Sequence, residues 1–467
     1  MENDQRTSRR NFIKLAATGI ATTSISSRVF ALERTYEFGG RPFSQNDKIR
    51  VALIGTGGRG MDITMNAIRV PGVELMACAD VYQGRLTRAK EIWGQEFKGL
   101  FTTRDYREIL SRSDVDAVII ATPDHWHSKI AVDAMNAGKD VYLEKPMVQK
   151  VDEGHAVIEA AKKNNRILQV GSQRVSSIIY QKAKELLAAG AIGELNMIEA
   201  WWDRNSALGA WQYSIPPDAS PQTVDWDRFI GSAPKRPFEP IRLFRWRNYQ
   251  DYGTGVAGDL FVHLFSGMHF VVNAKGPTRV MTTGGLRYWK DGRDVPDIML
   301  GLYDYPVTPQ HPAFNLFLKV NFADGGGDSS EFKFIGNNGL MSIGNSGVTV
   351  TKKVPEKEPG FSVETFPEAL QRQYLDDYRK QYPSRKGVDR MRSDEVENYT
   401  VGRNYNDVYD HFVNFFAAVR SRQPVIEDAT FGFRAAGPAL LSNLAYFNNR
   451  IYQWDPETMK INGEAKS

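Results

Sequence analysis

Between residues 48 and 172, short apolar runs alternate with amphipathic segments of helical length. The runs Ile49–Ile54, Val73–Ala79 and Asp116–Thr122 consist mainly of β-branched and small apolar residues, as is typical of strands buried on both faces. Such runs separated by helices predict right-handed crossovers and a doubly wound parallel sheet. Further strands are expected at residues 100–103, 140–143 and 166–170, with helices starting near residue 61 and over residues 83–97, 106–110, about 127–137 and 151–164.

From Ser172 onward the pattern changes. A helix is expected over 176–189 and is followed by alternating apolar and polar positions over 193–202, which predict a half-exposed strand. Together with later strand-like segments, this pattern favours an α+β domain built on a large, mostly antiparallel open sheet. The other expected elements are strands at 279–283, 314–322, 331–335 and 348–351, helices at 408–420 and 433–447, substrate-facing loops over 211–249, and a surface insertion over 352–398.

The length of 467 residues exceeds what one core ordinarily supports, so two domains are expected, over 48–172 and 173–467. A hydrophobic content of 42% and a charged content of 24% are those of a soluble globular protein. The net charge is only +4, and no tract rich in lysine or arginine stands out, so no nucleic-acid partner is expected. The single cysteine, Cys78, lies in an expected strand, which excludes a disulfide within one chain.

The first 31 residues have the layout of a bacterial twin-arginine export signal. Arg9 and Arg10 precede a mildly apolar run over 15–25 and a small-residue ending near Ala31. The run is too short and too rich in Ala, Thr and Ser for a membrane span; a disordered basic tail is the alternative. We therefore expect an exported, periplasmic protein, with residues 1–31 outside the fold and residues 32–47 as an irregular arm.

The turn after the first strand carries the pattern G-x-G-x-x-G. In a strand–turn–helix unit, these glycines allow a tight turn, close approach of a pyrophosphate and close helix packing. Asp80 ends the next strand, about 20 residues further on, where a carboxylate would accept hydrogen bonds from a ribose. The alternative is a structural turn and an unrelated strand-end acid. The turn comprises Gly55, Thr56, Gly57, Gly58, Arg59 and Gly60.

Two more polar segments follow expected strands. Thr122, Pro123 and His127 follow the fourth strand, and Glu144 and Lys145 end the fifth. Ligands of doubly wound sheets bind beyond the carboxyl ends of the strands, so these residues should meet the glycine-rich turn at one edge. The two histidines at 125 and 127 have no third metal ligand near them in the sequence, so no metal site is expected.

In the second domain, Asp259 and His263 stand four residues apart in an otherwise apolar helical segment. On an α-helix this spacing places both side chains on one face. Such a pair is usually a solvated ion pair, but an apolar segment after a glycine-rich entry makes solvation unfavourable. We therefore interpret the pair as functional.

With these motifs, the chain resembles the glucose–fructose oxidoreductase and inositol dehydrogenase family (Gfo/Idh/MocA) over most of residues 48–275. The matching pieces are the glycine turn, Thr122-Pro123 with His127, residues 138–141, Glu144-Lys145-Pro146 and Asp259-x-x-x-His263. The resemblance implies a Rossmann domain, a bound nicotinamide cofactor and a carbohydrate substrate. It also implies that the residues named at the strand ends contact the cofactor. Finally, it implies a homo-oligomer in which the 32–47 arm packs on a first domain. A flexible tether is the alternative for the arm.

Oxidation of a secondary alcohol needs a base for the hydroxyl proton. His263 suits this role, with Asp259 orienting its ring and Lys145 stabilising the developing alkoxide. His127 is a candidate substrate contact. Asp80 favours NAD, because a carboxylate repels the 2′-phosphate of NADP, although Arg85 and Arg88 leave NADP possible.

Export implies either a retained cofactor or a redox-neutral reaction. We therefore expect a sugar dehydrogenase with tightly bound NAD, and keep as an alternative a glycosidase or lyase that oxidises its sugar transiently. The glycosidases that the chain resembles usually replace Glu-Lys-Pro and carry Tyr-Pro-Thr-His, whereas this sequence keeps Lys145 and lacks that segment. A non-catalytic NAD-bound sensor is the third hypothesis, and the intact Lys145, Asp259 and His263 count against it.

Overall fold

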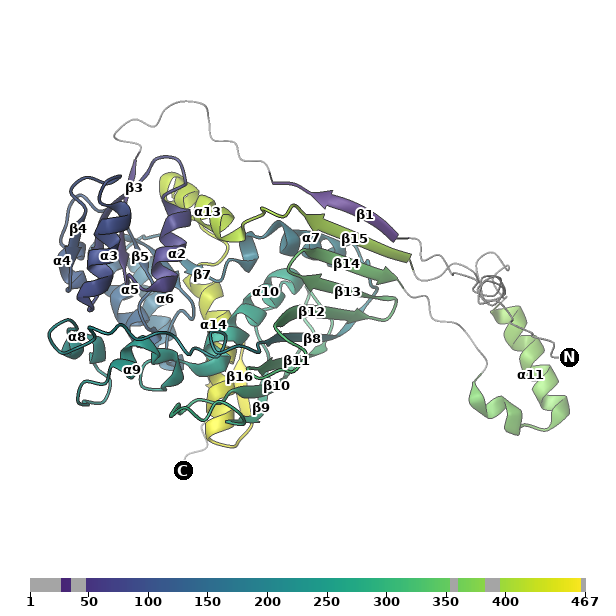
Figure 1. Cartoon of the computed structure of the whole chain (residues 1–467). Coiled ribbons are helices and arrows are strands. Elements are labelled where there is room, and N and C mark those ends of the chain that lie inside the picture. The colour runs from purple at the N-terminus through teal and green to yellow at the C-terminus, as the bar shows by residue number, and fades with distance from the viewer. Residues whose placement is uncertain (1–26, 35–47, 353–359, 383–394, 463–467) are drawn as a thin grey trace, which may run out of the picture.

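A six-stranded parallel sheet forms the lobe on the left of Figure 1. The computed structural model describes residues 27–34, 48–352, 360–382 and 395–462. Its strand order, β4-β3-β2-β5-β6-β7, places the first strand β2 in the middle, so the predicted doubly wound sheet is confirmed. The strands are β2 (Ile49–Ile54), β3 (Val73–Ala79), β4 (Phe101–Thr103), β5 (Ala117–Ile120), β6 (Asp140–Glu144) and β7 (Leu168–Gly171).

Helices cover both faces of this sheet, because its strands carry mostly buried apolar residues. One face packs against helices of the first domain and also against α13 (Asp407–Ser421), where Phe412 stacks on Tyr142 with ring centroids 4.3 Å apart. The C-terminal part of the chain therefore completes the first lobe. The other helices of this lobe are α2 (Gly58–Ala67), α3 (Gln83–Trp93), α4 (Tyr106–Leu110), α5 (His127–Asn136) and α6 (Gly154–Lys163).

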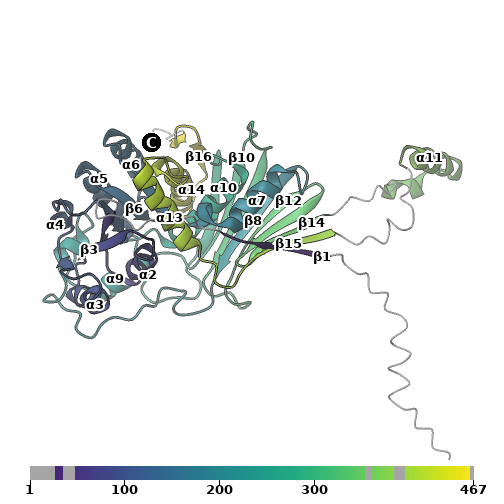
Figure 2. The same cartoon turned by 90° about the horizontal axis from the view of Figure 1, so that it is seen from above.

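An eleven-stranded sheet forms the other lobe, and one of its faces is covered by helices (Figure 2). Only the pairs β1–β15 and β8–β11 are parallel, so the predicted, mostly antiparallel sheet is confirmed. The covering helices are α7 (Ile178–Ala188), α10 (Val262–Val272) and α14 (Ala429–Phe447). In sheet order, the strands are β1 (Ser27–Leu32), β15 (Glu395–Val401), β14 (Gly347–Lys352), β13 (Gly339–Gly344), β12 (Ser329–Gly336), β8 (Leu195–Asp203), β11 (Phe314–Asn321), β10 (Ile298–Tyr305), β9 (Arg279–Gly285), β16 (Tyr452–Asp455) and β17 (Lys460–Asn462).

The edge strand β1 corrects the expectation that residues 1–31 lie outside the fold. Ser27–Leu32 pairs in parallel with β15, and the Phe30 ring stacks on Tyr399 at 4.9 Å between centroids. An apolar, small-residue ending is compatible with both a leader and an edge strand. The strand lies at the edge of the sheet, and the Val29 side chain remains 68% exposed there. The rest of the expected leader and residues 35–47 of the arm lie outside the described residues.

The excursion 204–250 leaves the second sheet after β8 and folds against the first lobe. It contains α8 (Trp226–Ile230) and α9 (Pro240–Phe244), and Val224 forms an isolated bridge with Tyr82 beyond β3. Tyr82 and Phe244 share a small hydrophobic core, with ring centroids 5.2 Å apart. The predicted loops over 211–249 therefore contain helical turns and cover the carboxyl edge of the parallel sheet.

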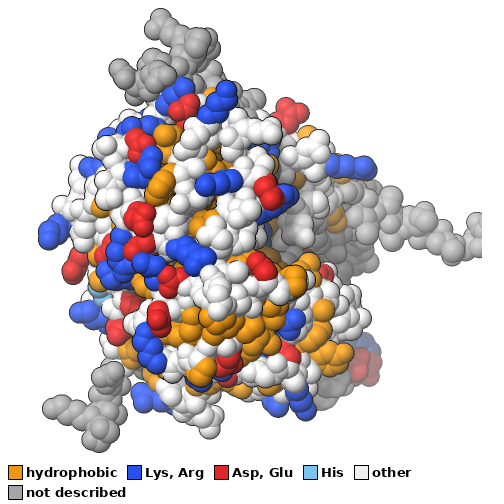
Figure 3. All heavy atoms as spheres, turned by 60° about the vertical axis from the view of Figure 1, so that its left-hand side comes forward, with side chains coloured by type: hydrophobic (Ala, Val, Ile, Leu, Met, Phe, Trp, Pro, Cys, Tyr) orange, Lys and Arg blue, Asp and Glu red, His pale blue; other side chains and the backbone are white. Residues whose placement is uncertain are grey.

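The surface of the first lobe carries lysine, arginine, aspartate and glutamate side chains in alternation (Figure 3). The remaining described helix, α11 (Glu368–Gln381), lies apart from the two lobes in Figures 1 and 2 and has no buried residue. No helix in the described ranges combines the length and the apolar character needed to cross a membrane.

Candidate active site

The glycine-rich turn joins β2 to α2 in a conformation that two of its glycines make possible. Gly55 has φ +95°, and a Cβ there would lie 2.6 Å from the Ala121 backbone. A Cβ on Gly60 would lie 2.0 Å from the carbonyl oxygen of Gly55. Helix α2 starts at Gly58 without a side-chain cap, so its first N–H groups are free for a phosphate.

Asp80 is buried at the end of β3 and holds this turn in place. One carboxylate oxygen accepts the Thr56 N–H at 2.9 Å, and the other accepts the Tyr82 N–H at 2.9 Å. Arg85 lies 3.4 Å from the Asp80 carboxylate and rests over the Phe244 ring of the excursion. Asp80 thus combines a structural bond to the glycine turn with a partly neutralised charge at the position expected for ribose.

A cleft of about 540 Å³ runs between the glycine turn and the excursion 204–250. The Thr122 hydroxyl in its wall is buried and has no hydrogen-bond partner among the described residues. Free N–H groups, a carboxylate and aromatic walls fit the phosphate, ribose and rings of a dinucleotide. The first domain contributes Gly55, Gly57, Gly58, Arg59, Asp80, Thr122 and Pro123 to the lining, and the excursion contributes Tyr213, Phe244, Trp246 and Arg247.

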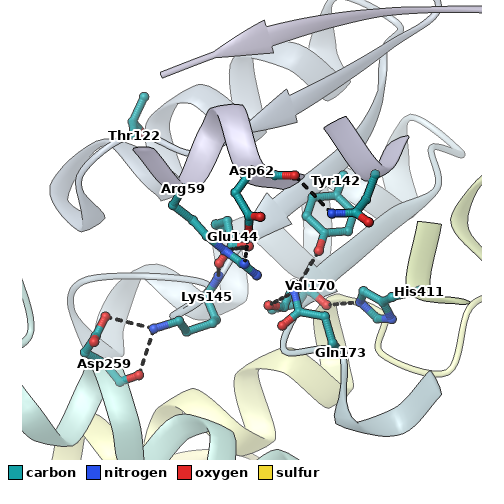
Figure 4. Close-up of polar contacts among 12 residues, drawn as sticks. Arg59, Asp62, Thr122, Tyr142, Glu144, Lys145, Val170, Gln173, Asp259 and His411 are labelled. Atoms are coloured by element: carbon teal, nitrogen blue, oxygen red, sulfur yellow. Dashed lines mark hydrogen bonds and ion pairs between the residues drawn. The ribbon is translucent and has the colours of Figure 1, made fainter. Parts of the chain in front are cut away.

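Arg59 and Glu144 connect the glycine turn to the end of β6 (Figure 4). The Arg59 Nε donates to Glu144 Oε1 at 2.9 Å, and its Nη1 donates to Asp62 at 2.8 Å. Burial alone would lower the pKa of Arg59, but Glu144, Tyr142 and Asp62 together outweigh burial and raise it. Glu144 is therefore a paired anion that holds the loop bearing Lys145.

His127 connects two strand ends and does not line the cleft. Its side chain is 1% exposed, its Nδ1 lies 2.7 Å from the Pro146 carbonyl oxygen, and its Nε2 lies 2.9 Å from the Thr122 carbonyl oxygen. The expected substrate or cofactor contact of His127 is therefore wrong. The sequence placed His127 at the correct sheet edge but could not show that its ring points inward.

Lys145 and Asp259 come together from the two domains, as expected (Figure 4). The Lys145 Nζ donates to the Asp259 carbonyl oxygen at 2.7 Å and to its Oδ1 at 2.8 Å. The Arg247 Nε donates to the same Oδ1 at 3.2 Å. Burial alone would raise the pKa of Asp259, but the charges of Lys145 and Arg247 outweigh burial and hold it well below the usual range.

His263 is separated from Asp259 by a change of helix type. Residues Ala257–Phe261 form a π-helical turn, and α10 begins only at Val262. The wider π turn displaces positions i and i+4 from a common face. Asp259 consequently bonds Lys145, and in the described part of the chain no hydrogen bond joins it to His263. The expected orienting role of Asp259 for His263 is therefore wrong in this structure.

The His263 imidazole is largely buried at the wall of a pocket. It is 8% exposed and packs beside Trp202, with ring centroids 5.2 Å apart. Its Nδ1 is buried and accepts or donates no hydrogen bond within the described ranges. Burial, followed by the positive charges of Lys145 and Arg174, holds the pKa of His263 well below 6.5. The ring is therefore neutral at neutral pH, and its buried Nδ1 lacks a partner within the described ranges.

A second, smaller pocket of about 300 Å³ opens at His263. Gln173 in its wall has φ +61°, and its side chain donates to the Tyr142 hydroxyl at 2.9 Å, which fixes the turn after β7. The sequence analysis missed this wall, although a polar Gln-Arg pair directly after a buried strand is a usable signal. The pocket is lined by Ser172, Gln173, Arg174, Ser177, Ile179, Tyr180, Trp202, His263, Gly344, Asn345, Tyr405 and Asp407.

His125, the other histidine considered for a metal, is part of the packing. Its Nε2 lies 2.8 Å from the Phe229 carbonyl oxygen, its ring packs on Tyr252, and burial lowers its pKa to about 4. The described residues contain no group of three or more His, Cys, Asp or Glu side chains that could hold a metal ion.

Residues 49–172 match the profile of an oxidoreductase family, GFO_IDH_MocA, described as an NAD-binding Rossmann fold. A glycosyl hydrolase family 109 protein of Shewanella baltica is 33% identical over 172 residues, which cover 34% of this chain and 38% of that protein. An alpha-N-acetylgalactosaminidase of Shewanella oneidensis is 36% identical over 123 residues, which cover 25% of this chain and 27% of that protein. The match thus spans less than two fifths of these relatives. The predicted nicotinamide cofactor is confirmed.

Solved structures extend the similarity in fold to most of the chain. A levoglucosan dehydrogenase in complex with NADH superposes with a TM-score of 0.61 at 16% identity, covering 86% of this chain and 98% of that one. The apo scyllo-inositol dehydrogenase of Lactobacillus casei superposes with a TM-score of 0.56 at 19% sequence identity. The superposition covers 87% of this chain and 98% of that one. At these identities the similarity establishes the two-lobed fold.

Proposed function

With residues 49–172 forming an NAD-binding domain of the Gfo/Idh/MocA oxidoreductases, we propose that the whole chain oxidises a secondary hydroxyl of a sugar, glycoside or polyol. The observation that carries the proposal is a connection between the two cavities. Arg247 lines the cleft and bonds Asp259, Asp259 bonds Lys145, and the charge of Lys145 acts on His263 in the pocket. We infer that a substrate in contact with His263 would approach Lys145 along this chain of contacts.

The two residues have complementary roles in this proposal. The neutral His263, which lines the pocket, takes the proton of the reacting hydroxyl. Lys145 uses two of its three N–H bonds on Asp259, which leaves one for the oxygen that becomes an alkoxide. Asp259 fixes the position of Lys145 and balances its charge. NAD, held by the glycine turn, Asp80 and Thr122, supplies the hydride acceptor.

The same proposal includes retention of the cofactor. The excursion 204–250 covers the cleft and is secured through the core around Tyr82 and Phe244. An exported enzyme would need such retention, because a twin-arginine route carries folded protein away from the cytoplasmic NAD pool. We expect NAD to remain bound through purification, and the signal at Arg9 and Arg10 to direct the chain to the periplasm.

The deciding experiment mixes the purified protein, with its bound cofactor, with a panel of sugars and glycosides and follows absorbance at 340 nm. A dehydrogenase reduces the bound cofactor once per active site and forms a keto sugar. His263→Ala and Lys145→Met should retain the cofactor and lose the signal. A non-catalytic sensor would bind a sugar without reducing NAD in any variant, and that outcome would contradict the proposal.

The family 109 relatives favour a second candidate, a redox-neutral glycosidase. Transient oxidation by the same residues makes the neighbouring C–H acidic, which permits elimination of the substituent. Water then adds to the unsaturated ketone, and return of the hydride to its carbonyl gives the free sugar. With a nitrophenyl glycoside in D₂O, this reaction releases nitrophenol, leaves the cofactor oxidised and places deuterium on the carbon beside the oxidised one. Net oxidation instead leaves reduced cofactor and an intact glycosidic bond.

A further inference from the structure

Arg174 is a charged group in the pocket that the chain itself does not pair. It begins the short helix that follows β7, and its guanidinium carbon lies 5.3 Å from the ring centroid of Tyr180 and 5.1 Å from that of Trp202. The Arg174 backbone bonds Ser172 and Ser177, but its guanidinium forms no hydrogen bond or ion pair in the described part of the chain. The guanidinium thus lies over two aromatic rings while the residue lines the pocket, so its N–H groups have no polar partner within the described residues.

Two carboxylates behind the pocket are paired with cations of the chain. Asp259 pairs with Lys145 and Arg247, and Glu144 pairs with Arg59. Asp407 is the one carboxylate among the described residues that line the pocket, and it lies beyond the 4 Å limit of an ion pair with Arg174. The guanidinium therefore adds a positive charge to a half-enclosed space where no carboxylate of the chain contacts it.

We propose that Arg174 binds an anionic group of the substrate, and that the substrate class is an acidic sugar whose carboxylate pairs with this guanidinium. This inference rests on the proposed function and narrows its substrate. A planar carboxylate matches the guanidinium fork in a bidentate pair, which gives orientation as well as affinity. Orientation by Arg174, next to His263 in the same pocket, selects which hydroxyl of the ring faces the base.

Binding of matched sugar pairs tests the inference independently of turnover. The NAD-loaded protein is titrated calorimetrically with methyl glucuronide against methyl glucoside, and with methyl galacturonide against methyl galactoside. We expect at least one uronide to bind 10-fold or more tightly than its neutral partner, and Arg174→Gln to abolish that preference. Arg174→Lys should restore part of it. Glucose 6-sulfate distinguishes a general anion site from a carboxylate site. A general anion site should bind glucose 6-sulfate and the uronide equally, whereas a carboxylate site should prefer the uronide.

Arg204 supplies the matched control. It also lies over the Trp202 ring, at 5.8 Å, but its guanidinium donates to the Gly209 carbonyl oxygen at 2.8 Å. Arg204→Gln removes the same charge near the same ring and should leave the uronide preference unchanged. Equal binding of uronides and neutral glycosides, or an equal loss of preference in both variants, would overturn the inference. Tight uronide binding without cofactor reduction would instead uphold it and contradict the proposed oxidation.

Discussion

The cleft beside the glycine turn and the pocket beside His263 are built on different principles. In the cleft, the charged side chains are satisfied by the protein: Asp80 accepts two backbone N–H groups, and Arg59 pairs with Glu144. In the pocket, the Nδ1 of His263 and the guanidinium of Arg174 have no hydrogen-bond or ion-pair partner in the described ranges. The cleft offers free backbone N–H groups and shape, whereas the pocket offers free functional groups.

This difference suggests that the cleft holds the cofactor and that the pocket carries out the reaction. A buried polar group without a partner costs about 1–3 kcal/mol, so it is retained where a ligand supplies the partner. Substitutions in the cleft should therefore change affinity for NAD, and substitutions around Lys145 and His263 should change turnover. Each of the following predictions tests this division.

The largest effect is expected at the two residues proposed for acid–base catalysis. His263→Ala and Lys145→Met should each lower the rate of reduction of bound NAD by about 10³-fold, because each removes a group that acts only on the reacting hydroxyl. Cofactor content per chain, measured after denaturation, should equal that of the wild type. Loss of NAD from either variant would show that these residues support the structure. It would also contradict the assignment of NAD affinity to the cleft and of turnover to Lys145 and His263.

Asp259→Asn should reduce the free energy of unfolding by about 3 kcal/mol, because it leaves two buried cations, Lys145 and Arg247, without their anion. Urea unfolding of the NAD-loaded protein measures the change. Asp62→Asn is the control: this partner of Arg59 is largely exposed, and its loss should cost less than about 0.5 kcal/mol. Equal stability of the two variants would show that Lys145 does not depend on Asp259.

Asp80→Ala should weaken NAD retention by about 10-fold, since it removes a charged acceptor for ribose and the bond to the Thr56 N–H. Dialysis of the loaded protein against buffer gives the release rate. Glu91→Gln, an exposed change on α3 that breaks only a surface pair with Arg88, should not alter release. Unchanged release in Asp80→Ala would restrict Asp80 to its structural bonds.

The smallest effect concerns pH. Because burial and the charges of Lys145 and Arg174 lower the pKa of His263, the acid limb of kcat/KM should lie below pH 6.5. Removal of one cation in Arg174→Gln should move this limb upward by less than about one pH unit. A neutral glycoside is used as substrate so that no charged group of the ligand titrates. A wild-type limb above pH 6.5 would mean that the base is another group.

The sequence predicted the cleft better than the pocket, for physical reasons. Buried parallel strands leave a continuous apolar signal, and their carboxyl ends must share an edge, so Gly55–Gly60, Asp80 and Lys145 could be placed together. The role of Asp259 toward His263 was wrong because a π-helical turn leaves no clear trace in residue spacing. Arg174 was missed because its partners, Tyr180 and Trp202, come from separate elements.

The second sheet was predicted only in outline. Strand β10 is interrupted by Gly301, and β13 is a six-residue segment bounded by Gly339 and Gly344, so both resemble turns in the sequence. These strands are stabilised by pairing with distant neighbours rather than by local preference. The contribution of the β13–β14 turn to the pocket wall could therefore not be predicted from the sequence, because it depends on how the strands pair.

Hydride transfer from a sugar carbon to the bound cofactor is the most direct test of the account. The NAD-loaded protein is mixed with carbon-perdeuterated sugars, including a uronic acid, and quenched within a fraction of a turnover. The account predicts deuterium on the nicotinamide ring by mass spectrometry in the wild type, and none in His263→Ala, which still holds its cofactor. Conversion of the sugar without deuterium on the nicotinamide at any quench time would contradict it.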